Sequence, residues 1–286
     1  MQAPILRVDQ QSAGALAYRQ AAIVITQLRR YQKPTYSSPL SLKFVLGGAE
    51  EYRIDGEAFR LEAGQYMVVN AGRPISVDFQ AKVPAVGVCI QPPLDLVEDV
   101  WAAYSGHAEL ESNDLRGEPS FLERPARALS DGFGRYFCRL SKYLVADPAL
   151  DHRPDLQTLY LEIAEQLVQS QLHLQQKLRS LPAKRSSTQR ELLHRLLTAR
   201  DFIEDNFNRQ FSLDELSQVA CLSKYYLIRS FKQLFGVSPY QYLLDLRLEK
   251  ARALQQSGHY SYSQIADLVG YSDSRNLRKA LQRNLK

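Results

Sequence analysis

The C-terminal fold is decided by the stretch Ser212-Leu-Asp-Glu-Leu-Ser-Gln-Val-Ala220, Cys221-Leu222, Ser223-Lys-Tyr-Tyr-Leu-Ile-Arg-Ser-Phe-Lys-Gln-Leu-Phe235. Ser212 followed by Glu215 is a capping-box pattern, so a short helix is predicted to begin there. After the turn, apolar side chains recur three and four residues apart, which gives a longer helix one face for burial. A short and a longer helix joined by a tight turn form a helix-turn-helix unit.

A second copy of this layout follows in Ser263-Gln-Ile-Ala-Asp-Leu-Val269, the turn Gly270-Tyr271, and Ser272-Asp-Ser-Arg-Asn-Leu-Arg-Lys-Ala-Leu281. The residues between the units, Pro239–Gln256, are predicted to form one helix about 27 Å long at 1.5 Å per residue. A rod of that length sets two recognition helices about one DNA turn, roughly 34 Å, apart. Further capping-box patterns mark helix starts at Thr188, Ser238 and Ser261.

The polar face of each longer helix carries side chains that suit DNA. Arginine binds guanine edges bidentately in the major groove, and lysine or serine anchors phosphates. The two faces offer Lys224, Tyr225, Arg229 and Lys232 in the first unit, and Ser274, Arg275, Arg278 and Lys279 in the second. Ordinary helix packing is the alternative for either unit alone, but two tandem copies in one basic segment weaken it.

The positive charge is concentrated in the segment that carries both units. The chain has 286 residues with 36 Lys+Arg and 31 Asp+Glu, a net charge of +5. Residues 1–182 hold 19 Lys+Arg and 21 Asp+Glu, whereas residues 183–286 hold 17 and 10. The polar stretch 180–188 is predicted to be a linker. A near-neutral module joined to a basic one suggests a polyanion partner, with a solvated basic surface as the alternative.

The N-terminal third is predicted to consist of strands. Asp55-Gly56 between two β-rich runs is a strong hairpin signal, because both turn residues need positive φ. The predicted strands are 23–25, 42–46, 52–54, 58–61, 66–69, 75–79 and 83–90. Many short antiparallel strands with Gly and Pro turns favour a jelly-roll barrel or sandwich.

The strand region resembles part of a cupin motif at Gly56, Glu62-Ala63-Gly64 and Asn70. Metal-binding cupins place several histidines on their inner strands. The five histidines here are His107, His152, His173, His194 and His259, and Met67 stands near the place of a ligand histidine. We therefore expect no metal, no cofactor and no enzymatic activity.

The barrel is predicted to enclose an apolar and aromatic pocket or, alternatively, a packed core. The candidate ligand-binding residues are Tyr52, Phe59, Tyr66, Met67 and Phe79.

The middle third is predicted to be helical and to contain a long helix over about 154–179. Its apolar residues fall mostly three, four or seven apart, which approximates a coiled-coil stripe. We predict a homodimer through Leu156, Tyr160, Ile163, Leu167 and Leu174. The alternative is that this amphipathic helix packs on its own barrel.

Residues 188–286 resemble the DNA-binding domain of the AraC/XylS family of bacterial transcription regulators. The resemblance is carried by 211–216, 222–232, 235–242, 247–254 and 265–272. The N-terminal third is similar to the cupin-like regulatory domain of such proteins. Together, these likenesses imply a regulator with an effector-binding module followed by a DNA-binding module.

The resemblance also implies which side chains face the major groove. In the first unit these are Tyr225, Ile228 and Arg229, and in the second Ser274, Arg275, Arg278 and Lys279. Ile228 cannot hydrogen-bond a base, so it is expected to contact a thymine methyl or to pack. The predicted DNA-binding set is completed by Ser223, Tyr226 and Ser272.

The sequence departs from the family pattern near its last residues. Leu277 and Leu281 stand where the family usually has Phe, and the sequence stops at Lys286, inside or just after the last recognition helix. We expect Leu281 and Leu285 to lack a cover. The second unit is accordingly expected to bind DNA weakly, or mainly through phosphates.

The sequence thus predicts a mixed architecture. An all-β cupin-like jelly-roll barrel followed by helices occupies 1–179, and an all-α domain with two helix-turn-helix motifs joined by a linker helix occupies 189–286. The predicted function is a sequence-specific transcription regulator controlled by a small-molecule effector in the barrel. The alternatives are a cupin-type enzyme with an accessory DNA-binding tail, and a ligand-binding or partner protein whose helical domain reads DNA poorly.

The predicted partners are double-stranded promoter DNA, the effector, a second copy of the chain and RNA polymerase. No membrane is expected, because no apolar run approaches the ~20 residues of a span. The first residues lack the apolar segment of a secretory signal. The three cysteines form no C-x-x-C pair and suit a reducing compartment, so a cytoplasmic location is expected.

Overall fold

The computed structural model describes residues 5–12, 21–107, 119–128, 131–147, 155–181 and 186–283. The chain forms two compact units, Met1–His173 and Leu174–Lys286. The predicted linker, 180–188, falls where helix α3 (Leu156–Ser180) ends and α4 (Ser186–Asp205) begins. Its residues 182–185 lie outside the described part of the chain.

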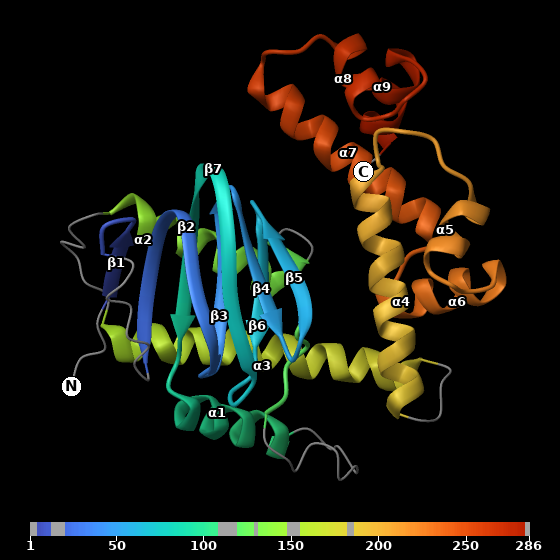
Figure 1. Ribbon diagram of the computed structural model, residues 1–286. Coiled ribbons are helices and arrows are strands. Elements are labelled where there is room, and N and C mark those ends of the chain that lie inside the picture. The colour runs from blue at the N-terminus through green and yellow to red at the C-terminus, as the bar shows by residue number, and fades with distance from the viewer. Residues whose placement is uncertain are drawn as a thin grey trace. The chain divides into compact units, whose positions relative to one another are not determined.

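The N-terminal unit is built on a mostly antiparallel sheet with the strand order β1-β2-β7-β3-β6-β8. β4 pairs with β5 and with β7 off this path, and β1 runs parallel to β2. The strands are β1 (Ile5–Asp9), β2 (Ala22–Ser37), β3 (Ser41–Gly47), β4 (Ala49–Ile54), β5 (Glu57–Glu62), β6 (Gln65–Val69), β7 (Pro74–Gln91) and β8 (Ala126–Arg127). This curved sheet, followed by helices, confirms the predicted fold class (Figure 1).

The long strands β2 and β7 pair along most of their lengths and hold the sheet together. The two predicted strands 75–79 and 83–90 are one strand, β7, which corrects that expectation. β7 stays continuous because it pairs with β4 near its start and with β3 near its end. β2 follows it through register shifts after Leu28 and after Lys33.

The predicted hairpin turn joins β4 to β5. Asp55 and Gly56 have φ of 49° and 84°, and the flanking Ile54 and Glu57 are paired. Two consecutive residues with positive φ match the right-handed twist of the strands that they connect. The hairpin prediction is therefore confirmed.

Two hydrophobic clusters lie on opposite faces of the strands. Neighbouring side chains alternate between them, since successive residues of a strand point to opposite faces. Val24, Val45 and Met67 belong to the inner cluster. The outer cluster includes Phe44 and Ile90 together with residues of α1 (Leu94–His107), α2 (Gly132–Ala146) and α3. The helices thus cover one face of the sheet.

The C-terminal unit is helical in its described residues. Two predicted helix-turn-helix units are present as α5 (Leu213–Val219) with α6 (Lys224–Phe235) and α8 (Tyr262–Leu268) with α9 (Ser274–Arg283). The predicted connecting helix is α7 (Pro239–Ser257) (Figure 1). The apolar side chains of the first helix-turn-helix unit gather around Phe231, and those of the second around Leu277.

Serine caps fix where most of these helices begin. The Oγ atoms of Ser212 and Ser238 accept the N–H groups of Glu215 and Gln241 at 3.1 and 3.2 Å. Ser261 and Gln264 form a complete capping box. A cap satisfies N–H groups that have no partner inside the helix.

Two expectations about helix ends are wrong. Thr188 lies inside α4, which begins at Ser186, so the Thr188 capping box does not form a helix start. Leu281 is 8% exposed and packs in the second cluster with Leu248 and Ile265. Residues of α7 and α8 therefore cover Leu281. Leu285 lies outside the described residues.

Phe231→Ala is expected to lower the free energy of unfolding of the C-terminal unit by about 3–5 kcal/mol, because it leaves a cavity in the core. The Phe231 side chain is fully buried, and its ring contacts those of Phe235 and Tyr242. Urea denaturation followed by far-ultraviolet circular dichroism measures the loss. The control is Tyr225→Ala, which removes a side chain 75% exposed on the same helix. Equal losses in the two variants would contradict the assignment of Phe231 to the core.

Candidate nucleic-acid interface and barrel cavity

Helix α6 presents a continuous exposed face opposite its core. Tyr225 and Ile228 are 75% and 38% exposed, and Arg229 and Lys232 are exposed beside them. Neither Arg229 nor Lys232 has a side-chain hydrogen bond or ion pair with any described residue. These four side chains share one face because α6 buries the other, with Leu227 among the buried side chains.

Three further predicted residues of the first unit are held within it. Ser223 Oγ accepts the N–H of Tyr226 at 3.4 Å and caps α6. The Lys224 ammonium lies 2.5 Å from a carboxylate oxygen of Asp214 on α5. Tyr226, also in the predicted DNA-binding set, is half-buried and packs against the first core. The turn between the helices includes Cys221 at φ 50°.

Helix α9 presents the second exposed face. Ser272, Arg275, Arg278 and Lys279 are exposed, and Ser274 is half-buried. The Arg278 guanidinium lies 4.4 Å from the centroid of the Tyr262 ring, a cation–π contact that orients it. The structure thus brings the predicted second-unit residues together at the start and along one side of α9.

Asp273 is a residue of this unit that the sequence reasoning missed. Its carboxylate accepts the N–H groups of Arg275 and Asn276, each at 2.8 Å. These bonds, that of Asn276 first, lower the pKa of Asp273. The signal was present in the sequence, since aspartate is a preferred N-cap residue.

A buried arginine joins the two helix-turn-helix units. Arg247 on α7 is 5% exposed and donates from Nε to the carbonyl of Phe207 at 2.6 Å and from Nη2 to that of Arg209 at 2.9 Å. Both carbonyls lie in the loop that leads into α5. Gly270, in the turn of the second unit, lies so close that an added Cβ would stand 2.8 Å from Arg247 Nη2. This junction fixes the second turn against the entry of the first unit.

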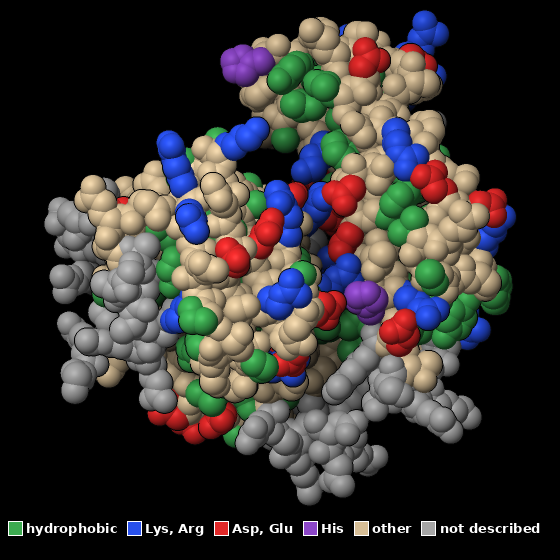
Figure 2. Space-filling model, in the orientation of Figure 1, with side chains coloured by type: hydrophobic (Ala, Val, Ile, Leu, Met, Phe, Trp, Pro, Cys, Tyr) green, Lys and Arg blue, Asp and Glu red, His purple; other side chains and the backbone are tan. Residues whose placement is uncertain are grey.

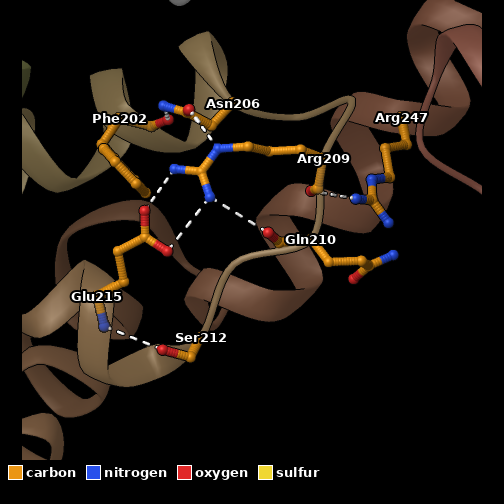
Figure 3. Close-up of polar contacts among 7 residues, drawn as sticks. All are labelled: Phe202, Asn206, Arg209, Gln210, Ser212, Glu215 and Arg247. Carbon is orange, nitrogen blue, oxygen red and sulfur yellow. Dashed lines mark hydrogen bonds and ion pairs between the residues drawn. The ribbon is translucent and has the colours of Figure 1, made fainter.

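Arg209 holds the same loop from the other side (Figure 3). Its Nε donates to Asn206 Oδ1 at 2.7 Å, and its guanidinium forms a two-pronged ion pair with Glu215. Because the backbone N–H of Glu215 also donates to Ser212 Oγ, the clamp fixes the start of α5. The pKa of Glu215 is lowered, first by the hydrogen bond from Arg209.

Basic and acidic side chains are interspersed on the face of the molecule shown in Figure 2. Several basic residues of the C-terminal unit are bonded within that unit. Arg195 and Arg209 donate to the carboxylates of Glu191 and Glu215, and Arg247 donates to a backbone carbonyl. The excess of positive charge in this part of the sequence is therefore not all available to a polyanion.

The inner side of the N-terminal sheet encloses a cavity of about 30 Å³. Two of the predicted ligand-binding residues, Tyr52 and Phe79, line it. Tyr66 instead lies in the outer cluster and donates to Asp131 at 2.8 Å, and Met67 and Phe59 pack in the inner cluster. These three side chains do not line this cavity, because the alternation of the strand turns Tyr66 outward and the other two pack in the inner cluster.

The cavity also contains polar residues that the sequence reasoning missed. Its lining includes Thr26, Lys43, Glu50 and Cys89. Lys43 and Glu50 are 3% and 7% exposed. Both lie on strands at inward-facing positions, but a charged residue in a strand is typical of a solvated face, so the sequence pattern gave no sign of their burial.

The predicted dimer stripe lies inside the structure of its own chain. Tyr160, Ile163 and Leu167 are at most 4% exposed in the outer cluster of the N-terminal unit. Leu156 packs against that cluster, and Leu174 packs against the first core of the C-terminal unit. These side chains offer no exposed seam for a second copy, and the alternative of a helix packed on its own barrel accounts for their spacing.

Comparison with known proteins identifies the family. The AraC-binding-like domain matches residues 6–173, more than half of the chain, and the helix-turn-helix domain matches residues 216–286. The chain belongs to the AraC/XylS family of transcription regulators. The two family regions coincide with the strand-rich part and with most of the helical part of the structure.

Curated relatives of this AraC/XylS-family chain match its C-terminal part. The probable transcriptional regulator LumQ of Photobacterium leiognathi is 34% identical over 83 residues, 29% of this chain and 34% of the relative. The transcriptional activator RhaS of Escherichia coli O139:H28 is 37% identical over 82 residues, 29% of this chain and 30% of the relative. The matched region spans about a third of the length of these relatives.

Solved structures match the same part of the AraC/XylS-family chain. The C-terminal domain of the response regulator yesN from Fusobacterium nucleatum is 31% identical and covers 31% of this chain and 92% of its own, with a TM-score of 0.30. The DNA-binding domain of AdpA, solved in complex with a target DNA, is 27% identical and covers 32% and 81%, with a TM-score of 0.30.

The described residues offer neither a membrane-spanning helix nor a cluster of metal ligands. In the ranges given above, no helix of the AraC/XylS-family chain combines the length and apolar character needed to cross a bilayer. The described His, Cys, Asp and Glu side chains form no group of three or more that could hold a metal ion.

Arg247→Met is expected to lower the free energy of unfolding of the C-terminal unit by about 1–3 kcal/mol, because the carbonyl groups of Phe207 and Arg209 lose their donor. The measurement is urea denaturation followed by far-ultraviolet circular dichroism. Glu249→Met, at an exposed position of the same helix, serves as the control and is expected to change little. An Arg247→Met variant as stable as the control would show that the junction contributes nothing to stability.

Proposed function

We propose that the chain is a sequence-specific DNA-binding transcription regulator whose DNA binding is controlled by a small molecule in the N-terminal barrel. The observation that carries the proposal is the pair of exposed recognition faces on α6 and α9, held in one unit by α7 and Arg247. The relatives named as transcriptional regulators match this same part of the chain.

The side chains proposed to read bases are those that the structure leaves exposed on the two helices. In the first unit, Arg229 supplies a guanidinium fork for guanine, and Tyr225 and Ile228 supply apolar contact. In the second unit, Arg275, Arg278 and Lys279 play the corresponding part. Ser223, Ser272, Lys224 and Lys232 are proposed to contact phosphates, which position the protein without reading sequence.

Regulation by an effector requires that the ligand favour one arrangement of the protein over another. The cavity between the strands supports a ligand site in the N-terminal unit. We further propose a homodimer, which would present two copies of the reading unit, RNA polymerase as a partner, and action in the cytoplasm. Analytical ultracentrifugation of the purified chain, with and without DNA, tests the dimer.

Binding to DNA is expected to weaken steeply with salt, because each lysine or arginine that meets a phosphate releases a counterion. The preferred site is first selected from a random duplex library with the full chain. Affinity for that site is then measured by fluorescence anisotropy over a salt series. Affinity that is independent of salt, or equal for the selected and a shuffled duplex, would contradict the proposed function.

Arg229→Ala is expected to weaken binding to the selected site by about 1–3 kcal/mol, the usual value of a bidentate base contact. Arg229→Lys is the matched variant, because it keeps the charge but loses the planar fork. If Arg229 reads guanine, the lysine variant binds the selected duplex less tightly while its affinity for shuffled DNA is preserved. A lysine variant with wild-type preference would assign Arg229 to a phosphate instead.

A further inference from the structure

The barrel cavity contains a buried cation that has no oxygen partner within the described part of the chain. Lys43 on β3 is 3% exposed. Its ammonium contacts Cys89 Sγ at 3.8 Å and lies 4.8 Å from the centroid of the Tyr52 ring. Among the described residues it has no carboxylate within ion-pair distance and no oxygen acceptor within hydrogen-bond distance. A buried charge without such partners is costly, and a ligand that supplies them is bound correspondingly well.

Glu50, the nearest candidate for a counter-charge, already has its own donors. One of its carboxylate oxygens accepts the Tyr52 hydroxyl, and the other accepts Thr26 Oγ1 at 3.3 Å. Burial raises the pKa of Glu50, despite these bonds and the charge of Lys43. Glu50 is therefore committed to the wall of the cavity and does not complete the coordination of the Lys43 ammonium.

A second lysine adds positive potential near Lys43. Burial first, and the charge of Lys43 second, lower the pKa of Lys33 to about 8. The Lys33 ammonium lies 4.0 Å from the centroid of the Tyr36 ring. The pKa of Lys43 itself is raised, because the lowering effect of its burial is outweighed by the charges of Cys89, Tyr36 and Glu50. An anion that enters beside the two lysines favours the charged form of both. The electrostatics of this end of the barrel therefore favour an acidic ligand.

The space beside Lys43 is kept open by a glycine. A Cβ on Gly87 would collide with Glu50 Oε1 and stand 2.8 Å from Thr26 Oγ1, so any other residue would push into the cavity. The open volume of about 30 Å³ is room for about two water-sized groups, the space of one carboxylate. The remaining walls are apolar and aromatic, with Val24, Val77 and Phe79 among them.

We propose that the effector of the barrel is a small organic acid with one negative charge, whose carboxylate pairs with the Lys43 ammonium. The carbon body of this acid must be short, because the open volume of about 30 Å³ leaves little room beyond the carboxylate. Glu50 beside the site disfavours a dianion such as phosphate. The regulatory meaning of this site rests on the proposed function above, whereas its ligand chemistry rests on the cavity alone.

The test compares acids with neutral molecules of the same shape. Thermal unfolding and calorimetric titration of the full chain, without DNA, are measured with acetate, propionate and butyrate, with the matching amides, and with inorganic phosphate. At least one acid is expected to bind and raise Tm, whereas its amide does not. Lys43→Met is expected to lower the affinity for that acid by about 10- to 100-fold, because a charge-assisted hydrogen bond is lost.

Lys82→Met, at an exposed position of β7, is the matched control and is expected to bind the acid as the wild type does. If Lys43→Met does not fold, the comparison of acid with amide in the wild type decides by itself. Equal binding of both, stronger binding of phosphate, or an unchanged Kd for Lys43→Met would overturn the proposal.

The DNA-binding measurements separate this proposal from the proposed function. An acid that binds through Lys43 but leaves DNA affinity unchanged supports the site and contradicts its regulatory role. A chain that binds its selected DNA but none of the acids contradicts the acid site and leaves the DNA-reading function standing.

Discussion

The C-terminal unit depends on one buried arginine. Two helix-turn-helix units that bind the same duplex must keep a constant spacing and orientation. A connecting helix such as α7 fixes the spacing, but it does not by itself fix the orientation of the second unit's turn. Arg247 supplies that orientation by binding two carbonyls of the loop before α5 while it packs against Gly270 of the second turn. The hydrogen bonds from Arg247 and its close contact with Gly270 hold the exposed faces of α6 and α9 in a constant relative orientation.

The elements with a strong local signal could be predicted from the sequence. Both helix-turn-helix units, the connecting helix and the Asp55-Gly56 hairpin follow from caps, apolar spacing and turn residues, and the structure confirms them. The structure differs from the sequence-based predictions where tertiary contacts determine which side chains are buried. Tyr226 is half-buried against the first core, and most of the apolar stripe of α3 packs in the outer cluster of its own unit.

In the barrel, the sequence predicts only part of the lining of the cavity. Aromatic residues were natural candidates for a pocket, and Tyr52 and Phe79 do line it. The residues that give the cavity its chemistry, Lys43 and Glu50, are of types that are rarely buried. Their burial follows from the closure of β3 and β4 against β2 and β7, which no local pattern encodes.

The pairing of Lys224 with Asp214 has a consequence for the energetics of DNA recognition. Asp214 already serves this lysine as an anionic partner, so a contact between Lys224 and a phosphate exchanges one ion pair for another. The cations released by such a contact are those condensed on the DNA, so it still counts in the dependence of affinity on salt. The lost pair with Asp214 offsets part of the gain, so the salt dependence would overstate what Lys224 adds to affinity.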